Sequence, residues 1–264
     1  RDGVVSNMPS DQTGESSSKV TISNAIPTRD GFGFLGWCDT IPTTQGDVDS
    51  CSGTTYKSGN NYYINYADPG HNKFTLYALW MEATYIQDVS LSSCPTAKTM
   101  VFDKRDSKQY YIEKIGSVCW MTTNLDLAGG TALYSDTSNV PDGYPTDGGT
   151  PYYTLPVSST RGFSDASVAS VYNSGSTTCD DNSPCYSYYN FAAATAGTNP
   201  SEGDAVYDIC PKGWRLPTKD EYTALIGTYT TGATLTAAPF NGVYAGLYVS
   251  GSFYDGGSGG YYWS

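Results

Sequence analysis

The sequence has few charged residues, and basic ones are the scarcest. Charged residues make up 15% of the 264 positions, and 14 lysines and arginines stand against 26 aspartates and glutamates, for a formal net charge of -12. A surface of this sign repels phosphate groups, so nucleic acid and anionic membranes are poor partners. The sequence has one histidine, His71, in a turn-like stretch. A general base needs an orienting partner in a cleft, so we expect no catalytic role for His71.

Signatures of other protein classes are missing as well. No apolar run reaches transmembrane length, which predicts that this stretch is not embedded in a membrane. No glycine-rich loop precedes a Lys-Ser or Lys-Thr pair, so nucleotide phosphate binding has no support. The chain shows no signal peptide, opens at Arg1 and stops within the aromatic run 261–263. We therefore expect both ends to be cut from a longer protein.

Aromatic and turn-forming residues are abundant. There are 24 tyrosines and 29 glycines, and this composition favours strands and turns over long helices. Frequent aromatic residues also argue against disorder. We therefore expect a β-rich α+β fold. Tyrosine supplies rigid contact area with a polar tip, so the tyrosines either tile the sheets or form a binding surface, and both interpretations remain open.

Seven cysteines are spread along the chain, and none forms a C-x-x-C pair. Zinc sites usually draw on close cysteine pairs or on histidine, so the pattern is not typical of zinc. Spread cysteines in an acidic, β-rich chain are typical of disulfides, which form in oxidising compartments. We therefore predict an extracellular or cell-surface location. The odd number leaves one thiol without a partner in this stretch, which we take to be Cys210.

Residues 1–81 are expected to form a first, small β-sheet unit. A short strand is predicted near 20–22, and Asp30-Gly31 predicts a turn before a strand with apolar residues at 32, 34 and 37. A long polar loop is then expected, followed by a strand at 74–80. One face of that strand is apolar and implies a sheet that covers a core. The residues on this face are Phe74, Leu76, Ala78 and Trp80.

The first unit resembles the Listeria–Bacteroides repeat, also called the internalin B-repeat. The matching residues are Pro27, Gly31, Phe32, Phe34, Gly36, Trp37, Leu76, Tyr77, Ala78 and Trp80. The resemblance implies a β-grasp-like module of bacterial surface proteins, with Trp37 and Trp80 as structural residues. Cys38 and Cys51 are additions to the common pattern. A disulfide that closes their loop would stabilise the fold by about 3 kcal/mol on chain-entropy grounds.

Residues 82–93 lack periodicity and are predicted to be a linker to a second unit, 94–264. This unit opens with a hairpin signature, in which strands at 98–103 and 109–115 flank a turn at 105–108. Cys94 and Cys119 lie on either side of the hairpin, which predicts a disulfide between them.

Residues 128–185 are rich in Gly, Ser, Thr, Asp and Pro, so we expect an irregular, exposed stretch that offers variable contacts. Cys179 and Cys185 enclose a short, turn-rich loop, which predicts a local disulfide. Acidic residues on turns suit calcium, and they are also ordinary turn formers, so both interpretations stay open. The candidate calcium ligands are Asp180, Asp181 and Asn182 in one cluster and Asp136, Asp142 and Asp147 in another. No other cofactor is expected.

Two short helices are predicted in the second unit. One spans 186–196 and ends at Gly197, a natural C-terminal stop. The other begins at Thr218, where Glu221 three residues later forms a capping box: the hydroxyl accepts from one free backbone N–H and the carboxylate accepts from another.

The second unit resembles the Fibrobacter major paralogous domain. The matching segments are 119–125, 209–222 and 262–264, and Cys-Pro-Lys-Gly-Trp-Arg-Leu-Pro-Thr at 210–218 is the most specific part. The resemblance implies a secreted or surface domain without assigned catalytic residues, distantly similar to the C-type-lectin-like fold of formylglycine-generating enzymes. It also implies that the domain continues past Ser264, where the partner of Cys210 would lie. The residues expected to be structural are Trp120, Trp214, Thr218 and Glu221.

Three functions follow, in order of preference. The first is a non-enzymatic adhesion or ligand-binding role at the bacterial surface, with another protein, a host ligand or a glycan as partner. The second is a structural subunit of an extracellular, pilus-like filament, because the incomplete second domain leaves a strand edge for a neighbour. The third is an oxidoreductase like the formylglycine-generating enzymes, which hold copper on a reactive cysteine pair. This sequence does not display that pair, and fold analogy alone does not carry function.

Overall fold

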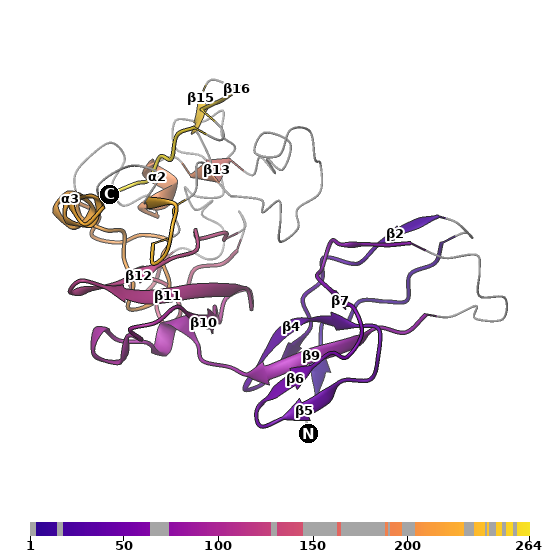
Figure 1. Cartoon of the computed structure of the whole chain (residues 1–264). Coiled ribbons are helices and arrows are strands. Elements are labelled where there is room, and N and C mark those ends of the chain that lie inside the picture. Colours follow the sequence, from indigo (N-terminus) through magenta and orange to yellow (C-terminus); the bar gives the residue numbers. More distant parts are fainter. Residues whose placement is uncertain are drawn as a thin grey trace. The chain divides into compact units, whose positions relative to one another are not determined.

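The computed structural model describes residues 4–14, 18–63, 74–127, 131–144, 163–164, 188–189, 191–196, 204–229, 235–240, 242, 247–249, 252–255 and 258–264. Of these, the residues up to Thr84 form one unit and those from Tyr85 on form another (Figure 1). Short β-strands are the main regular secondary structure among the described residues of both units, so the β-rich character expected from the composition is confirmed.

The first unit is an antiparallel sheet in which β4 and β9 are the longest strands. Its order is β1-β3-β4-β9-β6-β5, with β7 also paired to β4, and a separate ribbon joins β2 to β8. The strands are β1 (Val5–Ser6), β2 (Lys19–Thr21), β3 (Thr28–Arg29), β4 (Phe32–Cys38), β5 (Thr43–Gln45), β6 (Val48–Ser50), β7 (Thr55–Tyr56), β8 (Asn61–Tyr63) and β9 (Tyr77–Glu82).

The prediction of one long polar loop between β4 and β9 is wrong, because this stretch contains the four strands β5 to β8. Each has only 2 or 3 residues. Such short strands carry no readable alternation, and β7 and β8 pair with strands that come earlier in the chain. Their formation therefore depends on long-range pairing rather than on local pattern.

Aromatic rings from β4 and β9 form the core of the first unit. Phe34 packs edge-on against Trp37 and Trp80, with ring centroids 5.0 Å and 5.7 Å apart. Ile22 joins the same buried cluster. Trp37 and Trp80 are thus structural residues, in agreement with the sequence analysis.

Two residues of the predicted strand at 74–80 have surroundings that the pattern did not specify. Phe74 lies before β9, where its ring stacks on that of Tyr62 at 4.1 Å. Alternation along the strand places Leu79 on the face opposite Ala78 and Trp80, and Leu79 is also buried. Both faces of the sheet are therefore covered near the middle of β9.

Gly36 stands where the chain has no room for a side chain. A bulge interrupts the β4–β9 register between Phe34 and Gly36. The φ of Gly36 is 141°, and a Cβ placed there would lie 2.8 Å from the Tyr56 carbonyl oxygen. Glycine is required here because β7 approaches the bulged backbone this closely.

The second unit begins inside the stretch that was predicted to be a linker. Two short 3-10 turns, η1 (Ile86–Asp88) and η2 (Leu91–Ser93), occupy it. Ile86 is fully buried and packs against Val101, Tyr110 and Ile112. Residues 86–93 therefore belong to the fold of the second unit. The sequence carries no sign of this, because a single buried isoleucine produces no periodic pattern.

The predicted hairpin is confirmed. Strands β10 (Thr99–Phe102) and β11 (Gln109–Ile115) pair antiparallel, and β12 (Val118–Met121) adds a third strand. Half-buried and buried residues alternate at the start of β11, which places Tyr110 and Ile112 in the core. This meander is the framework on which the rest of the second unit packs.

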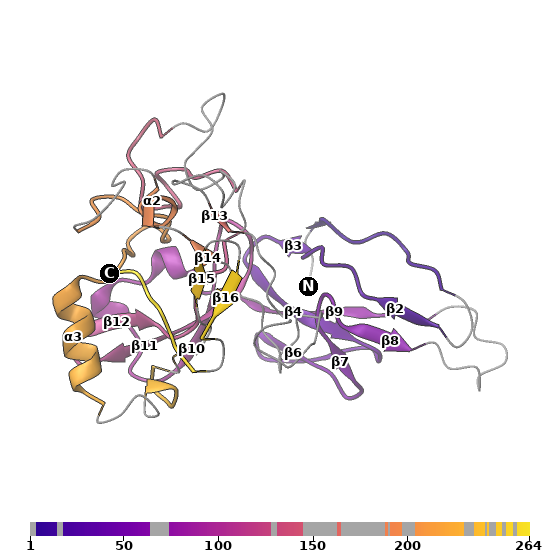
Figure 2. The same ribbon diagram turned by 90° about the horizontal axis from the view of Figure 1, so that it is seen from above.

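Helix α3 (Lys219–Gly227) covers one end of the meander (Figure 2). Its Leu225 packs with Ile115 and Trp120. The capping box is confirmed: the Glu221 amide donates to the Thr218 hydroxyl at 3.3 Å, and the Thr218 amide donates to the Glu221 carboxylate at 2.9 Å. Thr218, Glu221 and Trp120 are therefore structural.

The helix predicted over 186–196 is wrong in length. Its first part includes strand β14 (Tyr188–Tyr189), which pairs with β13 (Phe163–Ser164), and helix α2 spans only Phe191–Ala194. The Tyr189 hydroxyl donates to the Leu127 carbonyl and accepts from the Leu127 amide, both at 2.8 Å. These tertiary bonds hold β14 extended and override the local helical pattern.

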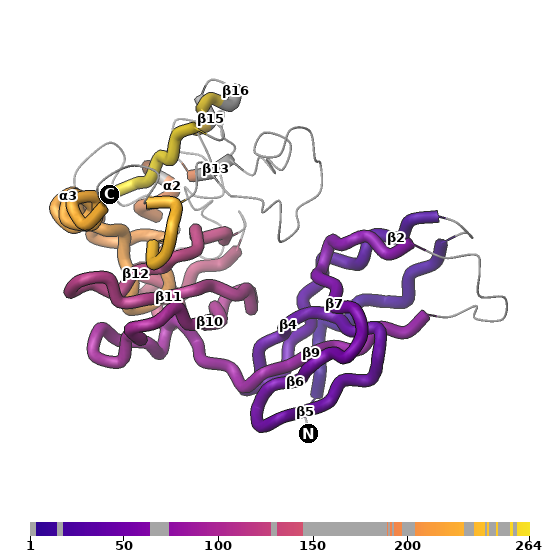
Figure 3. Tube along the Cα trace, viewed as in Figure 1, coloured from indigo at the N-terminus to yellow at the C-terminus, as the bar shows by residue number. Residues whose placement is uncertain are grey.

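A last hairpin, β15 (Leu247–Val249) and β16 (Ser252–Tyr254), precedes a segment that returns toward α2 and α3 (Figure 3). On this return Tyr262 contacts Tyr222 of α3, and Trp263 contacts Phe191 of α2. Among the residues that the structure describes, no helix is both long and apolar enough to cross a membrane.

Candidate functional site

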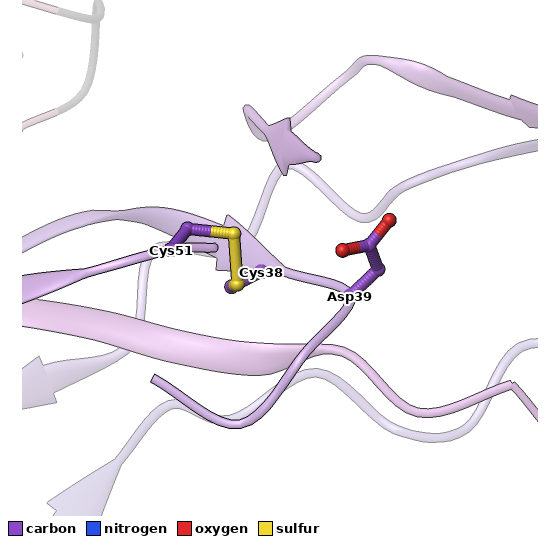
Figure 4. A group of neighbouring side chains, drawn as sticks. All are labelled: Cys38, Asp39 and Cys51. Atoms are coloured by element: carbon purple, nitrogen blue, oxygen red, sulfur yellow. A yellow bond between two sulfur atoms is a disulfide. The ribbon is translucent and has the colours of Figure 1, made fainter. Parts of the chain in front are cut away.

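Cys38, Asp39 and Cys51 form a compact group at the end of β4 (Figure 4). One ligand atom from each lies within 4.8 Å of the others, and no other such group of three occurs among the described residues. Asp39 is held in place because its carboxylate accepts from the Thr54 amide at 2.7 Å. By residue type alone, this group resembles a metal site.

The sulfur atoms of this group are joined in a disulfide, Cys38–Cys51. Disulfide sulfur is neither a thiolate nor a metal ligand, so the oxidised group serves as a cross-link. It ties β4 to the residue that follows β6, and Cys38 is completely buried. Asp39 then acts through its hydrogen bond to Thr54, which shapes the loop beside the disulfide.

The remaining cysteines of the described residues are also placed. Cys94, which follows η2, forms a disulfide with Cys119 of β12, the same pair that the hairpin suggests. Cys210 is free and buried. The predicted pair Cys179 and Cys185 lies outside the described residues.

The candidate calcium ligands lie mostly outside the described residues: Asp147, Asp180, Asp181 and Asn182 are not among them. Asp136 and Asp142 are described, exposed and in separate turns. They belong to no described group of three acidic, cysteine or histidine ligands.

A buried ion pair that the sequence analysis missed lies in the turn between β10 and β11. The Arg105 guanidinium donates to both oxygens of Asp103, and the side chains are 1% and 0% exposed. Arg105 also donates to the Ile209 carbonyl at 2.6 Å, and Gln87 donates to Asp103 at 2.7 Å. The pair thus joins three segments that are distant in the sequence. The only local signal, Asp-x-Arg in a polar turn, is typical of solvated residues.

Asp208 is a second buried acid whose carboxylate accepts several hydrogen bonds. Its carboxylate accepts from the amides of Cys210 and Leu216 at 2.8 Å and 2.9 Å, and from the Asn139 side chain at 3.0 Å. Burial raises the pKa of Asp208, and the two backbone donors counter part of that effect. These bonds fix the start of the 210–218 segment, in which Trp214 donates to the Ile86 carbonyl at 2.8 Å. Trp214 is therefore structural, as expected.

The Cys210 thiol sits against this carboxylate. Burial, and then the negative charge of Asp208, raise the pKa of Cys210 well above its ordinary value. A thiol held protonated is a poor nucleophile and a poor metal ligand. The local electrostatics therefore favour an inert Cys210.

Asp106 is the least satisfied acid of the described residues. Its Oδ1 accepts from the Lys108 amide at 3.0 Å, while Oδ2 is buried with no hydrogen-bond partner. Burial, and then the charge of Asp103, raise the pKa of Asp106 to about 6. The group therefore titrates near neutral pH in the folded protein.

Arg215 and Glu221 form a bidentate ion pair at the start of α3. The two guanidinium nitrogens donate to the two carboxylate oxygens at 2.7 Å and 2.8 Å. The hydrogen bond from Arg215 is the largest cause that lowers the pKa of Glu221 to about 2. The pair strengthens the capping box, which is a structural rather than a catalytic task.

Large aromatic side chains are exposed near the end of the described chain. Tyr254, Tyr261 and Trp263 are 53%, 56% and 45% exposed. Tyr254 precedes Asp255 in the chain, and the Asp255 carboxylate accepts a hydrogen bond from the Tyr261 hydroxyl at 2.5 Å. Trp263 instead donates to the Tyr189 carbonyl at 2.6 Å. We call these exposed residues of the last segment, Tyr254, Asp255, Tyr261 and Trp263, the Asp255 surface. The sequence analysis noted exposed tyrosines in general but did not single out these residues, because their exposure depends on how the last segment packs.

Comparisons of the chain with protein-family models, with curated proteins and with solved structures found no match.

Proposed function

We propose that this chain is a non-enzymatic binding module of a bacterial cell-surface protein, acting in adhesion or ligand display. The sequence motifs support a β-grasp-like repeat at 1–81 followed by a lectin-like domain at 94–264. The two resemblances imply modules of bacterial surface proteins, and the second implies a domain without assigned catalytic residues.

The observation that carries this proposal is that the described cysteines in disulfides and the buried acids have structural roles, while aromatic side chains are exposed. Four cysteines are in disulfides, and the buried acids Asp103 and Asp208 accept structural hydrogen bonds. Large amphipathic side chains, by contrast, face solvent at the Asp255 surface. Exposed aromatic groups with polar tips are typical of binding surfaces.

The disulfides support the proposed location. Stable disulfides form outside the cytosol, so the pairs Cys38–Cys51 and Cys94–Cys119 favour an extracellular compartment. Mass spectrometry of the non-reduced protein tests this point. We expect both pairs to be intact and Cys210 to be free, whereas two or more additional free thiols would favour the oxidoreductase alternative.

A binding assay with the whole chain tests the function. Labelled protein is applied to an array of glycans and to immobilised collagen, fibronectin and fibrinogen, with and without a calcium chelator. We expect saturable binding to at least one target. Loss of binding on chelation would assign a role to calcium, and no binding to any target would contradict the proposal.

A filament subunit is the second candidate, and the edge of the first sheet at β5 favours it. Among the described residues, β5 is the last strand in the sheet order, and all three of its residues are exposed. Ile41 and Val48 beside it are 72% and 42% exposed. An uncharged edge with nearby apolar side chains is suited to pairing with another strand. Light scattering after size-exclusion chromatography separates the two proposals, since a monomer at high concentration argues against the filament.

A further inference from the structure

We propose that the turn between β10 and β11, residues 103–108, is a pH-operated latch of the second unit. The latch is closed while the Asp106 carboxyl carries a proton, and it opens locally when that carboxyl ionises. The proposal concerns how this unit holds its segments together, and it does not depend on the proposed binding function.

The turn joins segments that are far apart in the sequence. Arg105 donates to the Ile209 carbonyl at 2.6 Å, which attaches the segment around Ile209 to the meander. Gln87 of η1 donates to the Asp103 carboxylate at 2.7 Å. Opening of the turn would therefore release η1 and the Ile209 segment together from β10 and β11.

Hydrogen bonds from the backbone close the turn. The Ser107 amide donates to the Asp103 carbonyl at 2.8 Å, and the Asp103 amide donates to the Lys108 carbonyl at 2.9 Å. The Arg105 amide donates to the Asp103 carboxylate at 2.9 Å. Ser107 has a φ of 60°, a left-handed conformation that costs free energy for residues other than glycine. These hydrogen bonds must offset that local strain, so a new unfavourable charge shifts the turn toward opening.

Asp106 is the group in the closed turn that responds to pH. Its Oδ1 accepts from the Lys108 amide at 3.0 Å, whereas its Oδ2 is buried and, among the described residues, has no hydrogen-bond partner. A protonated carboxyl is tolerated in this position, but a buried carboxylate oxygen without a donor is costly. Ionisation therefore destabilises the closed turn, while an open turn lets water solvate the charge.

The groups around this turn compensate for the charge of Asp106 only in part. They are Asp103, Arg105, Lys108, Tyr110 and Asp126. Both cations already have carboxylate partners, because Arg105 binds Asp103 and Lys108 binds Asp126, each at 2.6 Å. Burial raises the pKa of the Tyr110 phenol well above its ordinary value, so this group stays neutral. Ionised Asp106 is thus a third carboxylate beside two cations.

The direction of the switch follows from the pKa of Asp106. Burial, and then the charge of Asp103, raise this pKa from 3.8 to about 6 in the closed turn. Below about pH 4 the carboxyl is protonated whether the turn is closed or open. Above about pH 6 the closed turn must hold the charge, so the open form gains. A pKa difference of about two units makes opening up to about 100-fold more favourable at high pH than at low pH.

Native-state hydrogen exchange of the whole chain, followed by NMR at pH 4 and pH 7 in low concentrations of urea, tests the latch. The amides of Arg105 and Ser107 report on the turn, and the Lys104 amide, which donates to Gln87 at 3.2 Å, reports on the contact with η1. The Arg105 guanidinium N–H groups report on the contact with Ile209. The Ile112 amide, within β11, reports on global unfolding.

At pH 7 we expect the turn reporters to exchange through one shared opening that hardly depends on urea. The Ile112 amide should exchange only through global unfolding, which depends strongly on urea. After correction for intrinsic exchange rates, the turn should open about 50-fold more at pH 7 than at pH 4. Asp106→Asn should abolish this pH dependence, because the amide side chain stays neutral. Asp142→Asn, at an exposed acid of the same unit, is the matched control and should retain it.

Three results would overturn the latch. Equal protection and equal urea dependence of the turn and Ile112 amides at pH 7 would show that Asp106 acts on global stability alone. Equal opening of the wild-type turn at pH 4 and pH 7 would show that Asp106 does not control it, and this result needs no variant. Exchange of the turn amides without exchange of the Arg105 guanidinium would show that the contact with Ile209 does not depend on the turn.

Discussion

The cores of the two units are built from different chemistry. In the first unit, Phe34, Trp37 and Trp80 pack edge to face. In the second, a buried ion pair between Arg105 and Asp103 adds to small apolar clusters and joins Gln87 to the Ile209 carbonyl. Among the described residues, each unit also has one disulfide that joins a strand to a neighbouring loop or turn.

The difference follows from how the units are connected. The seven-stranded sheet of the first unit supplies its own backbone pairing, so aromatic packing is enough to fill its core. Among the described residues, the second unit has a three-stranded meander and two separate two-stranded ribbons, β13-β14 and β15-β16. Its connections carry backbone groups that need partners, and buried side chains such as Arg105 and Asp208 provide them. We expect the second unit to be more sensitive to loss of one polar side chain.

The largest expected effect is the loss of Arg105. Arg105→Met leaves Asp103 as an unpaired buried charge and should destabilise the second unit by about 3–5 kcal/mol. Hydrogen exchange followed by mass spectrometry should show faster exchange in β10 to β12 and no change in β4 and β9. Lys104→Met is the control, since the Lys104–Asp88 pair is exposed and its loss should cost under about 1 kcal/mol. Equal effects of the two variants would contradict the buried-pair interpretation.

Removal of the disulfide from each unit compares the two units through the same kind of cross-link. They close loops with sequence separations of 13 and 25. On chain-entropy grounds Cys38→Ser/Cys51→Ser should cost about 3 kcal/mol, and Cys94→Ser/Cys119→Ser about 0.5 kcal/mol more. Urea unfolding of both double variants measures the difference. A larger loss in the first unit would show that native packing around Cys38, rather than loop length, sets the cost.

Asp106 predicts a pH dependence specific to the second unit. The pKa of Asp106 is raised from 3.8 to about 6 in the folded state, so the folded protein binds more protons than the unfolded one between these values. Stability from this group is complete below about pH 4 and is lost as the pH rises through about 6. Asp106→Asn should therefore stabilise the protein by about 1–3 kcal/mol at pH 8 and by almost nothing at pH 4.

Urea unfolding at both pH values measures the Asp106 effect. Asp142→Asn, at an exposed acid, serves as the control and should change stability at neither pH. A gain from Asp106→Asn that is the same at pH 4 and pH 8 would point to packing rather than charge.

The smallest expected effect concerns α3, the longest helix that the structure describes. Thr218→Ala removes the hydroxyl that accepts from the Glu221 amide and should cost about 1 kcal/mol. Thr223→Ala, on the exposed face of the same helix, should cost less because alanine has the higher helix propensity. Amide exchange within α3 compares the two. No difference between them would show that the Arg215–Glu221 pair alone holds the helix start.

Local patterns predicted the elements that depend on local interactions. The turn at Gly31, the hairpin of β10 and β11, and the capping box at Thr218 were all readable, because each is decided by residues within a few positions of one another. The strands β5 to β8 were not readable, since each is short and stabilised by partners elsewhere in the sheet. The helix predicted over 186–196 failed for the same reason, as the Tyr189 hydroxyl bonds to Leu127.

The candidate site shows the same division. The sequence identified cysteines to pair and tyrosines to display, but it carried no sign of which rings are exposed. The Asp255 surface arises because Tyr262 packs inward on Tyr222 while its neighbours Tyr261 and Trp263 remain exposed. That choice depends on where α3 lies, and no pattern within 254–263 encodes it.

By itself, the sequence determined the β-rich character, the acidic surface and the cysteines available for disulfides, because composition and residue type decide these directly. Only the tertiary structure decided which acids are buried and which aromatic rings face solvent. Arg105 and Asp103 illustrate the reason: in sequence they look like an ordinary polar turn, and they become a buried ion pair because distant segments close over them. Burial is a property of the assembled fold, and it sets both the stability and the chemistry of these groups.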